Sequence, residues 1–203
     1  MITVLADKVA YFFVRKGVAK EEDIEIYQYG VGLFLSTVFD IIAVIIISLF
    51  TGMVLGTVFF MIFFMSLRTL TGGYHADSYF KCFLVFIVVY SLSSLTVFLT
   101  PDAYIMQFIF WLTVVSSIFI VAFSPVESNN KPLSIEQKII LRKKSLIIYL
   151  TQVIIVFVGM YFLKDFSKDF YFASLGYVTA SLALVVAIKK ENERRRKNEK
   201  ENV

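Results

Sequence analysis

The chain has 203 residues, of which 58% are hydrophobic and 18% are charged, and its formal net charge is +4. In a soluble domain about half of the residues are apolar, even when glycine is counted as apolar. The composition of this chain, with a mean hydropathy of +0.76, therefore excludes a soluble domain. One cysteine and one histidine exclude an intrachain disulfide and a zinc site drawing on several such residues. No metal or organic cofactor is implied, and aromatics inside apolar runs do not indicate nucleic-acid binding.

The first segment, residues 2–16, predicts an amphipathic helix. Charged residues interrupt the apolar core that a cleavable signal peptide needs. We therefore expect the helix to lie in the membrane interface, with a cap on the helical bundle as the alternative. Its apolar residues fall on one helical face: Ile2, Leu5, Val9, Phe12 and Phe13.

Six apolar segments follow, near the length of about 20 residues that crosses a bilayer. After them comes a basic tail, residues 189–203, which we expect to be frayed helix or disordered chain. The predicted fold is one all-α membrane domain over residues 1–203, a polytopic bundle of about six transmembrane helices. The spans are expected at residues 26–50, 52–68, 79–99, 103–123, 145–163 and 170–188.

The distribution of basic residues predicts the orientation of these spans. If the N-terminus is cytoplasmic and six spans alternate, every Lys and Arg except Lys164 and Lys168 falls in a cytoplasmic segment. Basic residues are enriched in cytoplasmic loops. We therefore expect both termini in the cytoplasm and residues 68–82 near the cytoplasmic face.

The only histidine and the only cysteine, His75 and Cys82, lie seven positions apart between two apolar segments. A cysteine nucleophile needs a base, and histidine is the usual one. One straight helix would separate them by about 10 Å, so we expect the flexible Gly72–Gly73 turn to fold His75 back. Asp77 or Ser78 is a plausible helix cap that would place Cys82 near a helix start. From spacing alone, a packing cysteine and a solvated histidine remain open.

The pattern Arg68-x4-Gly73-x-His75-x6-Cys82 resembles the signature of the AgrB family, membrane peptidases that process precursors of autoinducing peptides. The resemblance continues into the Pro- and Lys-containing segment 124–133 and the basic run 142–144 that follows it. Tyr29–Gly30 is a weaker match. The length and the six-span layout fit the family across nearly the whole chain.

This resemblance implies a cysteine endopeptidase of quorum sensing in a bacterial cell membrane. Cys82 would attack a precursor at the junction between its signal core and its C-terminal tail, with His75 as base and then acid. A precursor Cys or Ser would then close a thiolactone or lactone ring on the acyl-enzyme thioester. The family also suggests importance for Arg68 and Gly73, a homodimer, and a precursor with an amphipathic leader and an acidic tail.

Asp40 lies in the middle of the first span, where a carboxylate is costly and is a functional candidate. It could orient His75, pair with a Ser or Thr of another helix, or face an internal cavity. Asp77 is expected to cap a helix rather than to orient His75.

The remaining basic candidates have two interpretations each. Arg142, Lys143 and Lys144 could bind anionic lipid and fix the topology, or dock an acidic segment of the precursor, as the family resemblance suggests. Lys131 could shape a substrate cleft, but its loop shows no evident catalytic group.

Two other functions compete with the peptidase: a small membrane transporter and a non-catalytic membrane scaffold. A transporter predicts polar residues along several spans, whereas Asp40 is almost the only charge in mid-span. Both alternatives make Cys82 dispensable. Substituting Cys82 and His75 therefore separates the peptidase from both alternatives.

Overall fold

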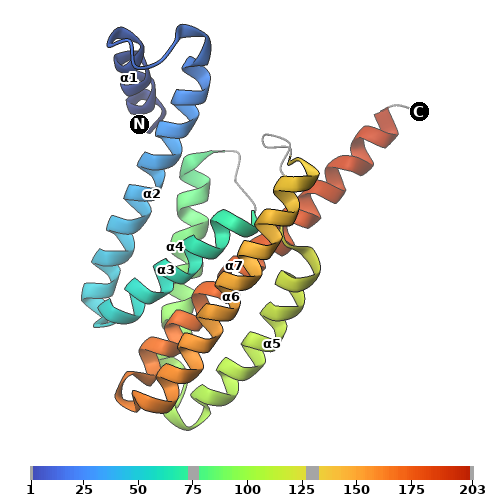
Figure 1. Ribbon diagram of the computed structural model, residues 1–203. Helices are drawn as coiled ribbons and strands as arrows, with labels where there is room; N and C mark the ends of the chain where they lie inside the picture. The colour runs from blue at the N-terminus through green and yellow to red at the C-terminus, as the bar shows by residue number, and fades with distance from the viewer. Residues whose placement is uncertain (1, 73–77, 127–132, 202–203) are drawn as a thin grey trace. The chain divides into compact units, whose positions relative to one another are not determined.

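The computed structural model in Figure 1 describes residues 2–72, 78–126 and 133–201, except for the side chains of residues 191 and 194–201. The described residues form helices and no strand, in this order: α1 (Ile2–Arg15), η1 (Glu21–Asp23), α2 (Ile24–Thr51), α3 (Val54–Thr71), α4 (Tyr79–Leu99), η2 (Asp102–Tyr104), α5 (Ile105–Phe123), α6 (Ile135–Phe162), η3 (Lys164–Phe166) and α7 (Ser167–Glu201).

Six of these helices, α2 to α7, are long and apolar enough to cross a membrane. The chain is therefore an all-α polytopic membrane protein, which confirms the predicted fold class. The predicted N-terminal helix also forms, as α1. Its position in the membrane interface stays a prediction.

The helix ends follow local capping as well as the apolar runs. Helix α4 has the bounds of the predicted span 79–99. Helix α6 begins at Ile135, well before residue 145, because Ser134 and Gln137 form a capping box. Helix α7 continues to Glu201, so the backbone of the predicted tail is helical to that residue. Neither helix has to end where the bilayer ends.

The described helices divide into two compact units. Unit 1 contains residues 1–50 and 76–91, and unit 2 contains residues 51–75 and 92–203. Unit 1 therefore holds α1, α2 and the beginning of α4, and unit 2 holds α3, α5, α6 and α7.

Unit 2 is built around α7, which packs most extensively against α3 and also against α5 and α6 (Figure 1). Gly176 of α7 lies close to the backbone of α3, because a Cβ there would lie 2.6 Å from the Phe60 carbonyl oxygen. Nearby, the rings of Phe60 and Phe172 have centroids 5.1 Å apart. Small residues at such crossings let helix backbones approach closely in a membrane.

Buried hydroxyl groups join α5, α6 and α7 within unit 2. The Tyr177 hydroxyl lies 2.6 Å from Thr113 Oγ1. The Tyr149 hydroxyl donates to the Thr113 carbonyl oxygen at 2.8 Å and lies 2.9 Å from Ser116 Oγ and 2.7 Å from Ser117 Oγ. Because polar groups without partners are costly in an apolar medium, these contacts hold the helices in one register.

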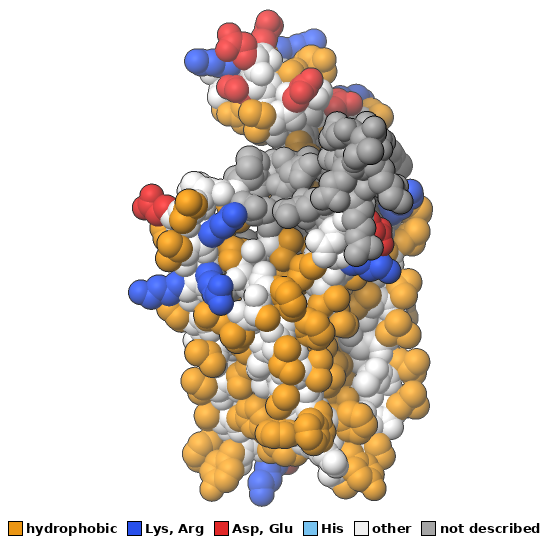
Figure 2. Space-filling view, turned by 90° about the vertical axis from the view of Figure 1, so that its right-hand side faces the viewer, with side chains coloured by type: hydrophobic (Ala, Val, Ile, Leu, Met, Phe, Trp, Pro, Cys, Tyr) orange, Lys and Arg blue, Asp and Glu red, His pale blue; other side chains and the backbone are white. Residues whose placement is uncertain are grey.

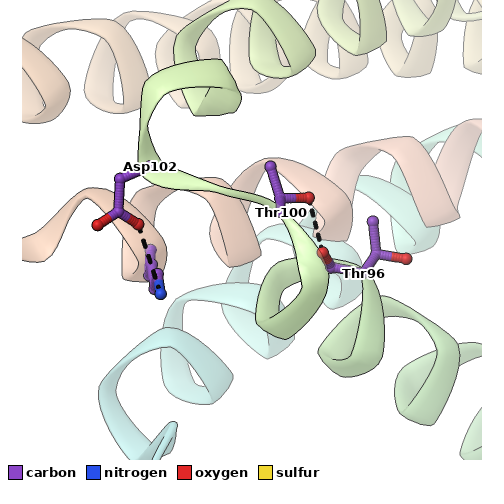
Figure 3. A network of polar contacts seen from close by, with 4 residues as sticks. Thr96, Thr100 and Asp102 are labelled. Carbon is purple, nitrogen blue, oxygen red and sulfur yellow. Dashed lines mark hydrogen bonds and ion pairs between the residues drawn. The ribbon is translucent and has the colours of Figure 1, made fainter.

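The turn between α4 and α5 carries a second polar group of contacts (Figure 3). Thr100 Oγ1 donates to the Thr96 carbonyl oxygen at 2.7 Å and so closes the end of α4. Lys168 Nζ lies 3.4 Å from an Asp102 carboxylate oxygen, with both side chains at least half exposed. An ion pair this exposed contributes little stability.

Unit 1 has a looser interior. Phe13 of α1 meets Tyr27 of α2 edge to face, with ring centroids 6.2 Å apart. An apolar groove of about 450 Å³ runs between these helices, beside Val9 and Phe34.

Hydrophobic side chains cover most of the helical surface visible in Figure 2, as expected of helices that face lipid.

Candidate functional site

Cys82 lies in the first turn of α4, and Ser78 caps that turn. The Cys82 backbone N–H donates to the Ser78 carbonyl oxygen at 3.1 Å. The Lys81 N–H donates to Ser78 Oγ at 3.3 Å. These are the two bonds of an N-cap residue, so the predicted cap is Ser78, and the expected place of Cys82 near a helix start is confirmed.

The Cys82 thiol is free and its side chain is partly buried. In an α-helix the Cα–Cβ bond tilts toward the N-terminus. The Cys82 Cβ therefore tilts toward the start of α4, which is the positive end of the helix dipole. A thiolate is the nucleophilic form of cysteine, so this position suits a reactive thiol.

Tyr79 fixes the start of α4 against α2 within unit 1. Its hydroxyl donates to the Tyr29 carbonyl oxygen at 3.4 Å. Its ring lies over Gly32, where a Cβ would be only 2.5 Å from the Tyr79 hydroxyl oxygen. The buried Gly32 thus leaves the notch that receives Tyr79, three residues before Cys82.

Arg68 lies in the last turn of α3, with its guanidinium 5.7 Å from the centroid of the Phe64 ring. Two residues of α3 that precede Arg68 accept hydrogen bonds from the buried Gln152 of α6. Gln152 Nε2 donates to Ser66 Oγ at 2.9 Å and to the Phe63 carbonyl oxygen at 3.1 Å. Gln152 thereby ties the C-terminal half of α3 to α6. Its Oε1 atom is buried and has no hydrogen-bond partner among the described residues.

The end of α3 also contacts the segment after α5. Gly72 has φ 73°, and the Val126 N–H donates to the Thr71 carbonyl oxygen at 2.9 Å. Ser124, two residues before Val126, is buried with its Oγ 2.8 Å from Ser145 Oγ of α6. Residues 71–72, directly before Gly73 of the family-like pattern, therefore lie in unit 2 beside residues 124–126, which begin the family-like segment 124–133.

The basic run of α6 separates into two kinds of residue. Arg142 Nη2 donates to the Val121 carbonyl oxygen at 3.2 Å and so closes the C-terminal turn of α5. Lys143 and Lys144 are exposed. Arg142 is exposed as well, so all three basic side chains are accessible to lipid or to an acidic peptide, and Arg142 differs only in its contact with α5.

Asp40 lies within α2 and is partly buried, with its Oδ1 atom inaccessible to solvent. It belongs to unit 1, as does Cys82. Its predicted role stays open.

Gly73, His75, Asp77 and Lys131 lie outside the described residues. The expected pairing of His75 with Cys82 and the expected cleft at Lys131 therefore stay predictions. Among the described residues no three His, Cys, Asp or Glu side chains form a group that could hold a metal ion.

Sequence reasoning missed the contacts that position the site. The Gly32–Tyr79 and Thr71–Val126 pairs join segments about fifty residues apart, and no local pattern reveals them. The start of α6 could have been predicted from Ser134 and Gln137, because Ser-x-x-Gln before an apolar run is the pattern of a capping box.

The fold and the site define a polytopic helical membrane protein with a thiol in the first turn of a spanning helix. A sequence profile described as accessory gene regulator B (AgrB) matches residues 6–188. The chain belongs to the AgrB family.

Two relatives from Clostridium perfringens agree with this membership, and both have names that call them only AgrB-like. The protein from strain SM101 is 34% identical and a protein from strain 13 is 31% identical, each over 122 residues. Each alignment covers 56% of this chain and 56% of the relative, so the chain spans little more than half of their length. No solved structure gives a significant match.

Proposed function

We propose that this chain is a membrane-embedded cysteine endopeptidase. It removes the C-terminal tail of a quorum-sensing precursor peptide through an acyl-enzyme thioester and promotes closure of a thiolactone or lactone ring. The nucleophile is Cys82 and the base is His75. Membership of the AgrB family supports a part in autoinducer processing.

One observation carries the proposal: the only thiol of the chain lies in the first turn of α4, at a Ser78 cap. A lone cysteine buried for packing would not need this position. Here the partly buried side chain still leaves access for a peptide. The range that matches the family, residues 6–188, spans the positions of both Cys82 and His75.

In the first step, His75 takes the proton from the Cys82 thiol, and the sulfur attacks the carbonyl carbon at the tail junction. A tetrahedral oxyanion forms, and hydrogen-bond donors must stabilise it. The backbone N–H groups of Tyr79 and Phe80 are candidates, because the first N–H groups of a helix have no acceptor within it. The C–N bond then breaks, and the leaving amine receives the proton from His75.

In the second step, a thiol or hydroxyl of the precursor attacks the thioester. The C–S bond to Cys82 breaks, the new thioester or ester closes the ring, and the Cys82 thiolate is regained and reprotonated. Exchange between two thioesters requires little free energy, so ring closure competes when water is kept from the thioester.

The topology proposed for this chemistry has both termini in the cytoplasm. Six spanning helices place both ends on the same side of the membrane, and basic residues are enriched on the cytoplasmic side. The active site would then lie near the cytoplasmic face, where an amphipathic precursor can reach it from the membrane surface. A homodimer is part of the same proposal.

The test uses the chain in lipid nanodiscs with a synthetic precursor that has an amphipathic leader, a central Cys or Ser and an acidic tail. Tail release is followed by mass spectrometry. We expect Cys82→Ala and His75→Ala each to lower the rate by a factor of about 10³ or more, with precursor binding by Cys82→Ala retained. Unchanged tail release by Cys82→Ala would refute the peptidase and leave a transporter or scaffold.

The exposed Lys143 and Lys144 are proposed to attract the acidic tail of the precursor. In the same assay, Lys143→Gln with Lys144→Gln should raise KM about three- to tenfold at low salt and less at high salt, because salt screens exposed charges. Lys189→Gln with Lys190→Gln is the control for general positive charge. A KM that does not change would leave the two lysines to lipid binding.

A further inference from the structure

One backbone contact in unit 2 joins the described residues that precede two parts of the family-like pattern. Thr71 and Gly72 end α3, directly before the motif residues Gly73 and His75. Val126 ends the described part of the segment after α5, and Lys131 follows five residues later in the sequence. The Val126 N–H donates to the Thr71 carbonyl oxygen at 2.9 Å. We call the contact of residues 71–72 with residue 126 the clamp.

We propose that Gly72 is a positioning residue, which acts through the clamp to set the direction in which the chain leaves α3 toward His75. This inference rests on the proposed function, because it assigns Gly72 to the placement of the proposed base. It is distinct from the catalytic roles of Cys82 and His75, and it concerns residues of unit 2 only.

Two features make glycine necessary at position 72. Its φ of 73° lies in the left-handed region, which L side chains rarely adopt. In addition, a Cβ at this position would lie 2.5 Å from the Val126 carbonyl oxygen. That atom belongs to backbone, so it cannot rotate away as the end of a flexible side chain could. Any side chain at position 72 therefore has to open the clamp.

The Val126 side of the clamp is held by the bundle itself. Ser124 Oγ lies 2.8 Å from Ser145 Oγ, and Ser145 Oγ donates to the Arg142 carbonyl oxygen at 2.9 Å. Arg142 in turn closes the end of α5 through the Val121 carbonyl oxygen. Because α5 and α6 both anchor this segment, a substituent at Gly72 would displace residue 72 itself rather than the segment 124–126.

The chain offers a matched control for the effect of backbone conformation. Gly52, before the other end of α3, has φ 72° and no neighbouring atom within 4 Å of an added Cβ. Gly52→Ala therefore also places a side chain at a positive φ, but without the steric contact. It is the control for an alanine at positive φ beside an end of α3.

The first readout is steady-state tail release from the synthetic precursor. For Gly72→Ala we expect kcat to fall about 10- to 100-fold with KM within about threefold of wild type, because small misplacements of a catalytic group cost this much. For Gly52→Ala both constants should stay within about threefold of wild type. Equal kinetics for the two glycine variants would overturn the inference.

The second readout is the rate at which iodoacetamide alkylates Cys82 in the absence of precursor. Cys82 is the only cysteine, so the label reports on one thiol, and the thiolate is the reactive form. Gly72→Ala should slow alkylation toward the rate of His75→Ala. General unfolding would expose the thiol and speed alkylation, so lost activity with faster alkylation would also overturn the inference.

His75→Ala separates this inference from the proposed function. If His75→Ala releases tail and alkylates at the wild-type rates, the proposed dyad is wrong. If His75→Ala lowers both rates and Gly72→Ala lowers neither, the dyad stands and only the positioning role of Gly72 fails.

Discussion

Helix α2 of unit 1 and helix α7 of unit 2 differ in a way that reverses the usual relation between hydropathy and burial. The span containing α2 has the higher hydropathy, 2.6 against 1.8, yet 17% of its most apolar stretch is buried against 61% for α7. In a bilayer, lipid is as apolar as leucine, so hydrophobicity alone does not drive helices together. Burial follows small and hydroxyl-bearing residues instead.

The two units therefore suit different tasks. Unit 2 has glycine at helix crossings and a buried cluster of Tyr, Ser and Thr hydroxyl groups. Unit 1 carries Cys82 on α4, whose Tyr79 hydroxyl donates to the Tyr29 carbonyl oxygen of α2. We infer that unit 2 provides the stable frame and that the thiol lies in the unit with fewer fixed contacts. Three substitutions test this difference.

The largest effect on stability is expected from Gly176→Ala in unit 2. The added Cβ would lie 2.6 Å from the Phe60 carbonyl oxygen and 3.0 Å from Phe63 Cβ, so α3 and α7 would have to move apart. Such overpacking costs about 1–3 kcal/mol. Thermal unfolding in detergent should show this as a lower midpoint.

Gly30→Ala in α2 is the matched control in unit 1, because an added Cβ there has no neighbour within 4 Å. Alanine in a helix gains about 0.5–1 kcal/mol over glycine, so this variant should unfold at the wild-type temperature or above. If the two variants behaved alike, the proposed contrast between the units would be wrong.

A smaller loss is expected from Tyr149→Phe, which removes the hydroxyl that contacts Thr113, Ser116 and Ser117. Hydrogen bonds between membrane helices contribute about 0.6 kcal/mol each, with a maximum near 1.7. We expect a loss of about 1–2 kcal/mol in unfolding free energy, measured by titration with denaturant. Tyr161→Phe, at a side chain that is 72% exposed, should change nothing measurable.

The sequence predicted the spans because a bilayer imposes one length on all of them. It also predicted the place of Cys82 near the start of α4, because a capping residue precedes an apolar run there. The start of α6 was harder to predict from the sequence, because the charged residues of the segment Lys138 to Lys144 resemble those of a loop. The capping box at Ser134 starts the helix before those charged residues, because it gives acceptors to the first N–H groups. The charged residues are then part of α6.

The contacts that position the candidate site could not be predicted in the same way. Gly72 and Val126 meet through backbone atoms, and backbone atoms leave no pattern in the sequence. Gln152 is a polar residue in an apolar run, which indicates an interior position, but its partners Ser66 and Phe63 belong to a helix far away in the chain. Such pairs follow from how α3 and α6 cross, which one sequence does not specify.

The smallest effect on stability, and the one most directed at unit 1, is expected from Gly32→Ala. The added Cβ would meet the hydroxyl end of Tyr79 at 2.5 Å, and a flexible ring can rotate away, so unfolding should cost less than about 1 kcal/mol. The start of α4 would lose its anchor on α2, and tail release should fall about three- to tenfold. Because both changes act through one contact, the double variant with Tyr79→Ala should be no slower than Tyr79→Ala alone. Losses that simply multiply would show that Gly32 acts on the thiol by some route other than Tyr79.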